Sequence, residues 1–177
     1  MDERLLGLSC FAGIGGIDLA IRRNVKTICY IENEKYCQDI IKKNVQDGWL
    51  DDAPIWSDIC SFDGRPWNGK VDIVFGGFPC QSISLAGKGE GIEEGTKSGL
   101  WFEMLRIIEE TNPKYVFLEN VAGIRNRGLN TVLKGLSKNG FDAKWIMLRA
   151  NDIGAPHKRE RWFCLAWKRE LADTSCI

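Results

Sequence analysis

Residues 5–23 read LLGLSCFAGIGGIDLAIRR, and this stretch decides the fold. Leu5 to Cys10 is a short apolar run that is typical of a buried strand, and Gly15 to Arg23 has the apolar period of a helix. Between them, Phe11 to Gly16 form a glycine-rich turn, which lets the backbone approach a ligand closely and directs the amino end of the helix toward it. The stretch therefore predicts a strand, a ligand-binding turn and a helix, in that order.

The same alternation of apolar runs and helical periods continues along the chain. Further strands are expected at Lys26–Ile31, Pro54–Trp56, Asp72–Phe75, Tyr115–Glu119, Ala143–Leu148 and Arg161–Ala166. Further helices are expected at Glu34–Asn44, Gly99–Thr111 and Leu129–Lys138. This order predicts an α/β fold, a mostly parallel sheet with helices on both faces, whose ligands collect at the carboxyl ends of the strands.

Length and composition are those of one globular domain. The chain has 177 residues, of which 44% are hydrophobic and 27% charged, and no apolar run approaches the roughly 20 residues that cross a bilayer. The first residues show no signal-peptide pattern. We therefore expect a cytoplasmic protein with no contact to membranes.

The charge balance bears on nucleic-acid binding. Lysine plus arginine and aspartate plus glutamate number 24 each, so the formal net charge is zero. Because phosphate neutralisation supplies most non-specific affinity for DNA, this balance argues against tight DNA binding by the chain alone. A local basic group lies near the carboxyl end and comprises Lys158, Arg159, Arg161, Lys168 and Arg169.

Cysteine spacing predicts neither a metal site nor a disulfide framework. The seven cysteines show no Cys-x-x-Cys pair, and His157 is the single histidine of the sequence. Most of the thiols lie in apolar segments, where cysteine acts as a small hydrophobic residue. Cys80 differs, because Pro79-Cys80-Gln81 follows a strand and the glycines Gly76-Gly77. A cysteine at the carboxyl end of a strand, before a glycine-rich segment, is placed to be a nucleophile.

Two acidic residues follow strands on the cofactor side of the predicted sheet. Glu32 comes after the second strand, where a carboxylate can accept hydrogen bonds from ribose hydroxyls. Asp58 and Ile59 follow the third strand, where the aspartate can bind an adenine amino group and the isoleucine can pack on the ring, although a solvated turn reads the same way. These residues alone leave open a nicotinamide cofactor, since dinucleotide-binding oxidoreductases carry a related turn and acid.

Taken together, these motifs resemble the DNA cytosine-5 methyltransferases. The glycine turn, Cys80, Glu119-Asn120-Val121 and Arg159-Glu160-Arg161 follow one another in the order of that family, and the resemblance covers about Leu5 to Trp167. A nicotinamide oxidoreductase leaves the cysteine, the glutamate and the arginines unexplained. The resemblance implies an S-adenosylmethionine-dependent methyltransferase (Rossmann-like) fold with an antiparallel C-terminal strand.

The resemblance also implies the residues of the site. The cofactor would be S-adenosylmethionine, lined by Phe11, Gly13, Ile14, Gly15, Glu32, Asp58, Ile59, Gly77, Pro79 and Leu100. In the reaction, the Cys80 thiolate would add to C6 of a cytosine flipped out of double-stranded DNA, Glu119 would act at N3 and the exocyclic amine, and Arg159 and Arg161 would face the base or a phosphate. The residues expected to contact the nucleotide are Gln81, Ser82 and Ser84, at the start of a glycine-rich segment, 82–98, that is expected to be a lid.

The extent of the resemblance predicts the domain organisation. Residues 1–167 would form the S-adenosylmethionine-binding catalytic domain and 168–177 a C-terminal tail, with no target-recognition domain and no closing segment. We therefore expect the isolated chain to bind the cofactor weakly and to methylate DNA poorly or not at all, and a second polypeptide to supply target recognition. Three explanations of the missing segments stay open: a truncated gene or expressed fragment, one half of a split enzyme, and a decayed remnant kept for another purpose. The alternative functions are a non-catalytic or split-enzyme subunit and a tRNA cytosine-5 methyltransferase on the same scaffold.

Overall fold

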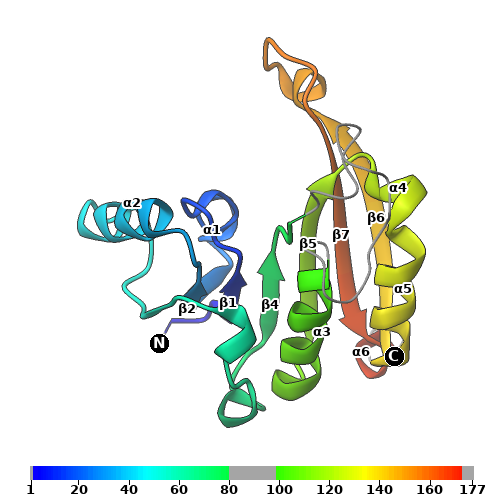
Figure 1. Ribbon diagram of the computed structural model, residues 1–177, viewed down its shortest axis with the longest axis horizontal. Coiled ribbons are helices and arrows are strands. Elements are labelled where there is room, and N and C mark those ends of the chain that lie inside the picture. The colour runs from blue at the N-terminus through cyan, green and yellow to red at the C-terminus, as the bar shows by residue number, and fades with distance from the viewer. Residues whose placement is uncertain (1, 80–98, 173–177) are drawn as a thin grey trace. The chain divides into compact units, whose positions relative to one another are not determined.

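The computed structural model describes residues 2–79 and 99–172 (Figure 1). The described chain divides into two compact units. Unit 1 comprises residues 1–77 and 106–115, and unit 2 comprises residues 78–105 and 116–177. Within the described residues, no helix is long and apolar enough to span a membrane.

Unit 1 is built on four parallel strands. They are β1 (Leu5–Cys10), β2 (Val25–Ile31), β3 (Ile55–Trp56) and β4 (Ile73–Gly76), in the order β3-β2-β1-β4. The strands are short and apolar, and all four residues of β4 are buried. Because parallel strands end at the same edge of a sheet, the turns after β1, β2 and β3 lie along one edge of this unit.

The helices of unit 1 follow from the same periodicity. They are α1 (Gly16–Ile21), α2 (Lys35–Gln46) and the second half of α3 (Leu100–Thr111). Ile41 of α2 is fully buried against Tyr30 of β2 and Leu50, while Lys42 and Lys43 are exposed, as an amphipathic helix requires. Two short 3₁₀ turns, Ile59–Ser61 and Arg65–Trp67, connect β3 to β4.

Strands β1 and β4 approach very closely at their carboxyl ends. A Cβ atom placed on Gly76 would lie 1.8 Å from the carbonyl oxygen of Cys10. No real Cβ atom tolerates such a contact, so the sequence must have glycine at the point where β4 ends. This glycine brings the exits of the two strands together.

A buried carboxylate lies behind the glycine turn. Asp18, in the first turn of α1, is 3% exposed and accepts hydrogen bonds from the hydroxyls of Ser9 (3.1 Å) and Thr27 (2.9 Å). Burial raises the pKa of the Asp18 carboxyl to about 6, although these two hydrogen bonds act in the opposite direction. Asp18 thus ties α1 to β1 and β2 at the cost of burying an acid.

Asp18→Asn should change how stability depends on pH. A carboxyl whose pKa is higher in the folded than in the unfolded chain stabilises the fold while it is protonated, and that contribution is lost as pH rises from about 4 to about 6. The free energy of unfolding of Asp18→Asn minus that of the wild type should therefore grow by up to about 3 kcal/mol between pH 4 and pH 7. Urea unfolding at both pH values measures it, with Asp52→Asn, an exposed acid, as the control. A flat difference for Asp18→Asn would contradict the assignment.

Unit 2 contains the strands β5 (Tyr115–Val121, from Val116 on), β6 (Phe141–Arg149) and β7 (Glu160–Lys168), in the order β5-β7-β6. Strands β6 and β7 are antiparallel and pair along their whole length, from Phe141 with Lys168 to Arg149 with Glu160. The helices of this unit are the first half of α3, α4 (Ile124–Arg127), α5 (Leu129–Lys138) and α6 (Arg169–Ala172). Helix α5 packs against β6 (Figure 1).

The observed elements confirm most of the sequence prediction. The strand over Leu5–Cys10 and the helix over Leu129–Lys138 have the predicted bounds, and the antiparallel C-terminal strand is present. Two short α-helices were not predicted. Helix α4 has four residues between Gly123 and Gly128, too few to show an apolar period. Helix α6 lies where a tail was expected, and Arg169 holds it through hydrogen bonds to Asp142 and Ser137.

Candidate active site

The glycine turn and Glu32 form one structure at the carboxyl edge of unit 1. One carboxylate oxygen of Glu32 accepts the backbone N–H of Gly13 (2.7 Å), and the other accepts that of Glu34 (2.8 Å). Phe11 and Gly13 have positive φ angles, and a Cβ atom on Gly13 would meet no atom within 4 Å. A fixed carboxylate therefore lies beside open space on a bare backbone, which fits a ligand with ribose hydroxyls.

The turn after β3 places the other predicted cofactor residues of unit 1. Asp58 is exposed and its carboxylate accepts the N–H of Cys60 (2.9 Å), whereas Ile59 is only 6% exposed. Arg106 of α3 donates to the carbonyl oxygens of Ile59 and Phe62, both at 2.9 Å, and pairs with Glu110. Arg106 therefore holds this turn in place through its carbonyl oxygens, a role that no local sequence motif indicates.

Other predicted cofactor residues are placed as follows. Ile14 is 52% exposed beside the turn, whereas Gly15 is buried, has φ 84° and leaves no room for a Cβ atom next to Leu50. Gly77 follows β4 in unit 1 and is partly buried. Pro79 and Leu100 belong to unit 2 and are also partly buried.

Unit 2 holds a separate group of predicted residues, on the neighbouring strands β5 and β7. Nε of Arg161 contacts Oε1 of Glu119 at 2.8 Å, and the two side chains are 26% and 24% exposed. Arg161 also donates to the carbonyl oxygen of Glu160 at 2.9 Å. The structure thus joins two residues that are 42 positions apart, both predicted from the sequence. Arg159 is exposed and lies just before β7, where its carbonyl oxygen accepts the N–H of Ala150.

Asn120 organises the chain that leads to the predicted nucleophile. It is 3% exposed, its amide donates to the carbonyl oxygen of Phe78 (3.1 Å), and its side-chain oxygen accepts the N–H of Val121 (2.8 Å). The ring of Phe78 packs on that of Trp101 with centroids 5.2 Å apart. The sequence analysis gave Asn120 no role, because its partner lies 42 residues away. Cys80, Gln81, Ser82, Ser84 and the predicted lid at 82–98 lie outside the described residues.

The described cysteines form no disulfide, and they differ in how accessible their thiols are. Burial raises the pKa of the Cys29 thiol to about 11 and that of Cys164 to about 12, and it holds the pKa of Cys10 still further above its usual range. These three thiols are inert packing residues at neutral pH. Cys60, by contrast, is exposed.

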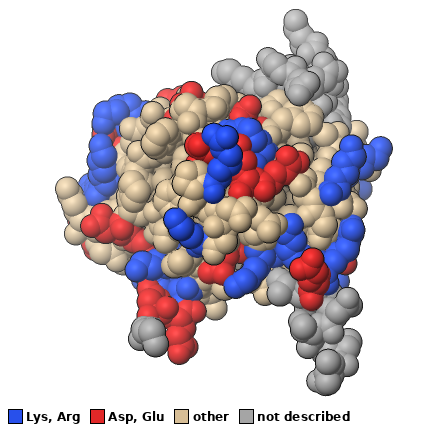
Figure 2. Space-filling view, turned by 90° about the horizontal axis from the view of Figure 1, so that it is seen from below, with Lys and Arg blue, Asp and Glu red and all other residues tan. Residues whose placement is uncertain are grey.

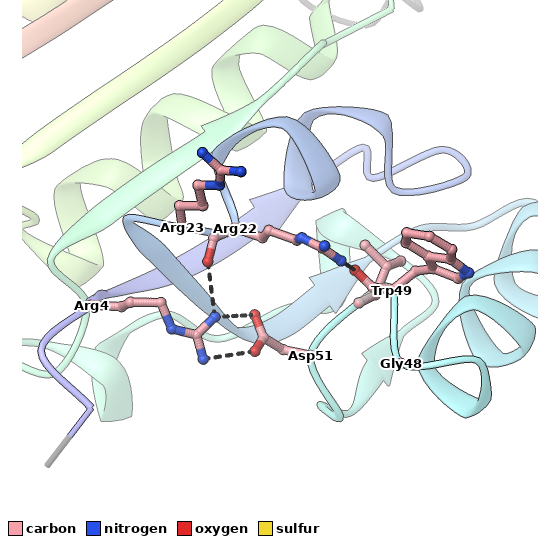
Figure 3. A pocket seen from close by; sticks show the side chains of 7 residues that line it. Arg4, Arg22, Arg23, Gly48, Trp49 and Asp51 are labelled. Carbon is pink, nitrogen blue, oxygen red and sulfur yellow. Dashed lines mark hydrogen bonds and ion pairs between the residues drawn. The ribbon is translucent and has the colours of Figure 1, made fainter.

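A hollow of about 330 Å³ lies at the opposite end of β1 from the glycine turn (Figure 3). Two of the three arginines that line it bind neighbouring groups: both Nη atoms of Arg4 contact Asp51 (3.0 and 3.3 Å), and Arg22 donates to the carbonyl oxygen of Trp49 (3.1 Å). The Arg22 guanidinium also lies 5.5 Å from the centroid of the Trp49 ring. We assign this cluster a structural role, because it ties the start of β1 to the end of α1 and the segment after α2.

The surface carries charges of both signs. In the view of Figure 2, lysine and arginine side chains are interspersed with aspartate and glutamate, in keeping with a formal net charge of zero. Among the described residues, no cluster of three histidine, cysteine, aspartate or glutamate side chains could hold a metal ion.

Comparison with known sequences assigns a family to this set of residues. The family model for C-5 cytosine-specific DNA methylase matches residues 6–175. The type II methyltransferase M.CviJI of Paramecium bursaria Chlorella virus IL3A is 35% identical over 171 residues, which are 96% of this chain and 45% of that protein. M.HhaI of Haemophilus parahaemolyticus is 33% identical over 181 residues, 96% of this chain and 52% of that protein. The chain thus spans about half the length of these relatives.

Solved structures agree on the fold. A DNMT2 structure from Spodoptera frugiperda matches with a TM-score of 0.75 at 20% identity, covering 94% of this chain and 51% of that one. The Entamoeba histolytica methyltransferase EhMeth matches with a TM-score of 0.73 at 22% identity, covering 93% and 53%. These likenesses confirm the predicted S-adenosylmethionine-dependent methyltransferase (Rossmann-like) fold.

Proposed function

Because the chain belongs to the family of C-5 cytosine-specific DNA methylases, we propose that it is the catalytic portion of a DNA cytosine-5 methyltransferase. The observation that supports this activity best is the contact between Glu119 and Arg161, which pairs an acid and a guanidinium from two separate motifs. We propose S-adenosylmethionine as the cofactor, with residues 1–167 as the domain that binds it. The substrate would be double-stranded DNA with the target cytosine flipped out, and the location would be the cytoplasm.

The proposed reaction begins with a covalent bond between Cys80 and the base. The Cys80 thiolate adds to C6 of cytosine, and the electrons of the C5–C6 double bond shift so that C5 becomes nucleophilic. S-adenosylmethionine, when bound, would supply the electrophilic methyl group for C5 and would leave as the neutral thioether S-adenosylhomocysteine. A base, for which the sequence names no residue, then removes the C5 proton, the double bond re-forms and the thiolate leaves.

Glu119 and Arg161 would stabilise the base during this addition. Attack at C6 pushes electron density toward N3, and Glu119 would protonate or hydrogen-bond that nitrogen while accepting from the exocyclic amine. Arg161 holds the Glu119 carboxyl through its Nε, which fixes the direction in which the carboxyl points. Arg159 and the residues Gln81, Ser82 and Ser84 would contact the nucleotide or its phosphates.

The edge of unit 1 fits the proposed cofactor. Glu32 would accept hydrogen bonds from the ribose hydroxyls, since each of its oxygens uses one lone pair on a backbone N–H and retains another. Asp58 and Ile59 would bind the adenine, and the bare backbone at Gly13 leaves room for the ligand. The cofactor-binding set would be completed by Phe11, Ile14, Gly15, Gly77, Pro79 and Leu100.

Glu32→Gln should weaken S-adenosylmethionine binding at least tenfold. The substitution removes the negative charge that accepts both the backbone and the ribose hydrogen bonds, and a lost charge-assisted bond costs about 1.5–3 kcal/mol. Isothermal titration calorimetry on the purified chain measures the change. Glu34→Gln, an exposed acid two residues further on, is the matched control and should bind within about twofold of the wild type. Equal loss in both variants would speak against the assignment of Glu32.

Covalent trapping tests the proposed activity. DNA that contains 5-fluorocytosine keeps the enzyme bound, because the fluorine at C5 cannot be removed as a proton can. We expect a denaturation-resistant adduct that requires S-adenosylmethionine and is absent in Cys80→Ala. Failure to form any adduct, alone or with a complementing polypeptide, would refute the proposal. An adduct with tRNA in place of DNA would favour the tRNA alternative.

The partner of the chain is part of the same proposal. The chain spans about half the length of these relatives. We propose that target recognition is supplied by a second polypeptide that corresponds to the other half of the relatives. The isolated chain should then react slowly, and the complemented chain faster.

A further inference from the structure

Trp56 is a large aromatic residue at the carboxyl edge of unit 1. It is the last residue of β3 and is 46% exposed. Its carbonyl oxygen accepts the N–H of Glu32 (2.9 Å), the residue that we propose binds the ribose. Asp58, which we propose binds the adenine amino group, follows two residues later in the chain. Trp56 therefore lies beside both polar groups of the proposed cofactor site.

The indole of Trp56 is fixed to the turn that carries Asp58. Its Nε1–H donates to Oγ of Ser61 (3.1 Å), and that hydroxyl donates to the carbonyl oxygen of Asp58 (3.0 Å). The Asp58 carboxylate caps the same turn by accepting the N–H of Cys60. These hydrogen bonds hold the indole along the turn, with its polar atom satisfied.

Phe62 supports the indole from the interior of the unit. Phe62 is 4% exposed, and its ring meets that of Trp56 edge to face, with centroids 5.9 Å apart and planes at 83°. Arg106 donates to the carbonyl oxygen of Phe62 (2.9 Å) and so anchors this support. A single exposed aromatic residue is common on protein surfaces. Trp56 differs because its ring is held in one place beside a proposed ligand site.

The proposed adenine site otherwise lacks apolar surface on this turn. Ile59, the residue predicted to pack on the adenine ring, is only 6% exposed and can offer a ligand little of its side chain. The exposed indole offers a planar apolar surface next to it, of the kind that stacks on a purine. Because the indole is already ordered, little side-chain entropy is lost when a ligand covers it.

We propose that the exposed part of the Trp56 indole stacks on the adenine ring of S-adenosylmethionine. The inference rests on the proposed function, and it adds a residue that the predicted cofactor-binding set does not contain. In this arrangement Glu32 binds the ribose, Asp58 binds the adenine amino group, and Trp56 holds the plane of the adenine ring.

Two substitutions of Trp56 test the stacking contact. Isothermal titration calorimetry of the full chain with S-adenosylmethionine should show binding at least tenfold weaker for Trp56→Ala, because the stacking surface is removed. Trp56→Phe keeps an aromatic ring and should bind within about threefold of the wild type. The matched control is Trp49→Ala. Trp49 is 54% exposed in the same unit but lines the hollow at the other end of β1 (Figure 3), so its loss should change binding less than twofold.

Hydroxyl-radical footprinting of the wild-type chain gives a second reading that needs no variant. Oxidation of each tryptophan is measured by mass spectrometry with and without saturating S-adenosylmethionine. Oxidation of Trp56 relative to that of Trp49 should fall at least threefold when the cofactor is bound, and the ratio corrects for radicals that the cofactor itself consumes.

Three outcomes would overturn the inference: wild-type affinity in Trp56→Ala, an unchanged ratio of oxidation with bound cofactor, or a loss in Trp56→Phe as large as that in Trp56→Ala. The last would assign the effect to the hydrogen bond with Ser61 rather than to stacking. Binding without any change at Trp56 overturns this inference alone, whereas a chain that binds no S-adenosylmethionine overturns the proposed cofactor as well. If Trp56 is protected but no DNA or tRNA adduct forms, the adenine contact stands and the proposed activity fails.

Discussion

Glu119→Gln is expected to slow formation of the covalent adduct with 5-fluorocytosine DNA by at least about 100-fold. Glutamine has the same shape as glutamate but cannot give a proton to N3, so the electrons that arrive from C6 are no longer neutralised. It also weakens the contact with Arg161 by removing the charge. The rate is measured by quenching the reaction in denaturant at successive times and separating the adduct by electrophoresis, with the complementing polypeptide present if the chain alone is too slow.

Two further variants make this result specific. Arg161→Ala should cause a loss of similar size, since the Glu119 carboxyl would lose the group that orients it. Glu160→Gln is the control: Glu160 is the neighbouring acid and pairs with Arg149 (3.0 Å), so its loss should change the rate less than about threefold. Wild-type rates in Glu119→Gln would remove Glu119 from the proposed chemistry.

Gly76→Ala is expected to lower the free energy of unfolding by at least about 4 kcal/mol, a large share of the roughly 5–15 kcal/mol of a typical domain. The new methyl group would lie 1.8 Å from the carbonyl oxygen of Cys10, and backbone atoms on both sides leave no flexible side chain to move aside. Strands β1 and β4 would have to separate at their carboxyl ends. Urea unfolding followed by circular dichroism measures the loss, and failure to obtain folded protein is the extreme of the same result.

Gly48→Ala separates crowding from backbone strain. Gly48 has φ 74°, so alanine is strained there as well, but its Cβ atom would meet no atom within 4 Å. It should cost only about 1–2 kcal/mol. If the two variants lose equal stability, the close approach of β1 and β4 is not what requires glycine at position 76.

Periodicity predicted the elements of this fold well, because the strands of unit 1 are mostly apolar and the longer helices are amphipathic. The predicted bounds of a strand differ from the observed bounds where pairing with a neighbouring strand, rather than composition, determines where the strand ends. Strand β6 was expected at Ala143–Leu148 but extends over Phe141–Arg149, since its pairing with β7 continues to Lys168 opposite Phe141 and to Glu160 opposite Arg149. Local patterns carry no information about such cross-strand partners.

The site could be predicted only in part, for a related reason. Glu119 and Arg161 were each marked by a motif, and their contact follows from two neighbouring strands. The roles of Asn120, Arg106 and Asp18 were missed, because each acts through a distant backbone carbonyl or a buried hydroxyl. No spacing rule connects Asn120 with Phe78 or Arg106 with Ile59. Polar residues that serve the architecture are visible only once the chain is folded.

The three buried thiols make it possible to measure how fast each unit opens. Cys10 and Cys29 are buried in unit 1 and Cys164 in unit 2, so an alkylating reagent at neutral pH can modify each only after its own unit opens. Mass spectrometry of timed samples would then report the opening rate of the two units separately, within one intact chain and without any introduced label. Equal rates would show that the two units unfold together in one cooperative step, and different rates would show that they unfold separately.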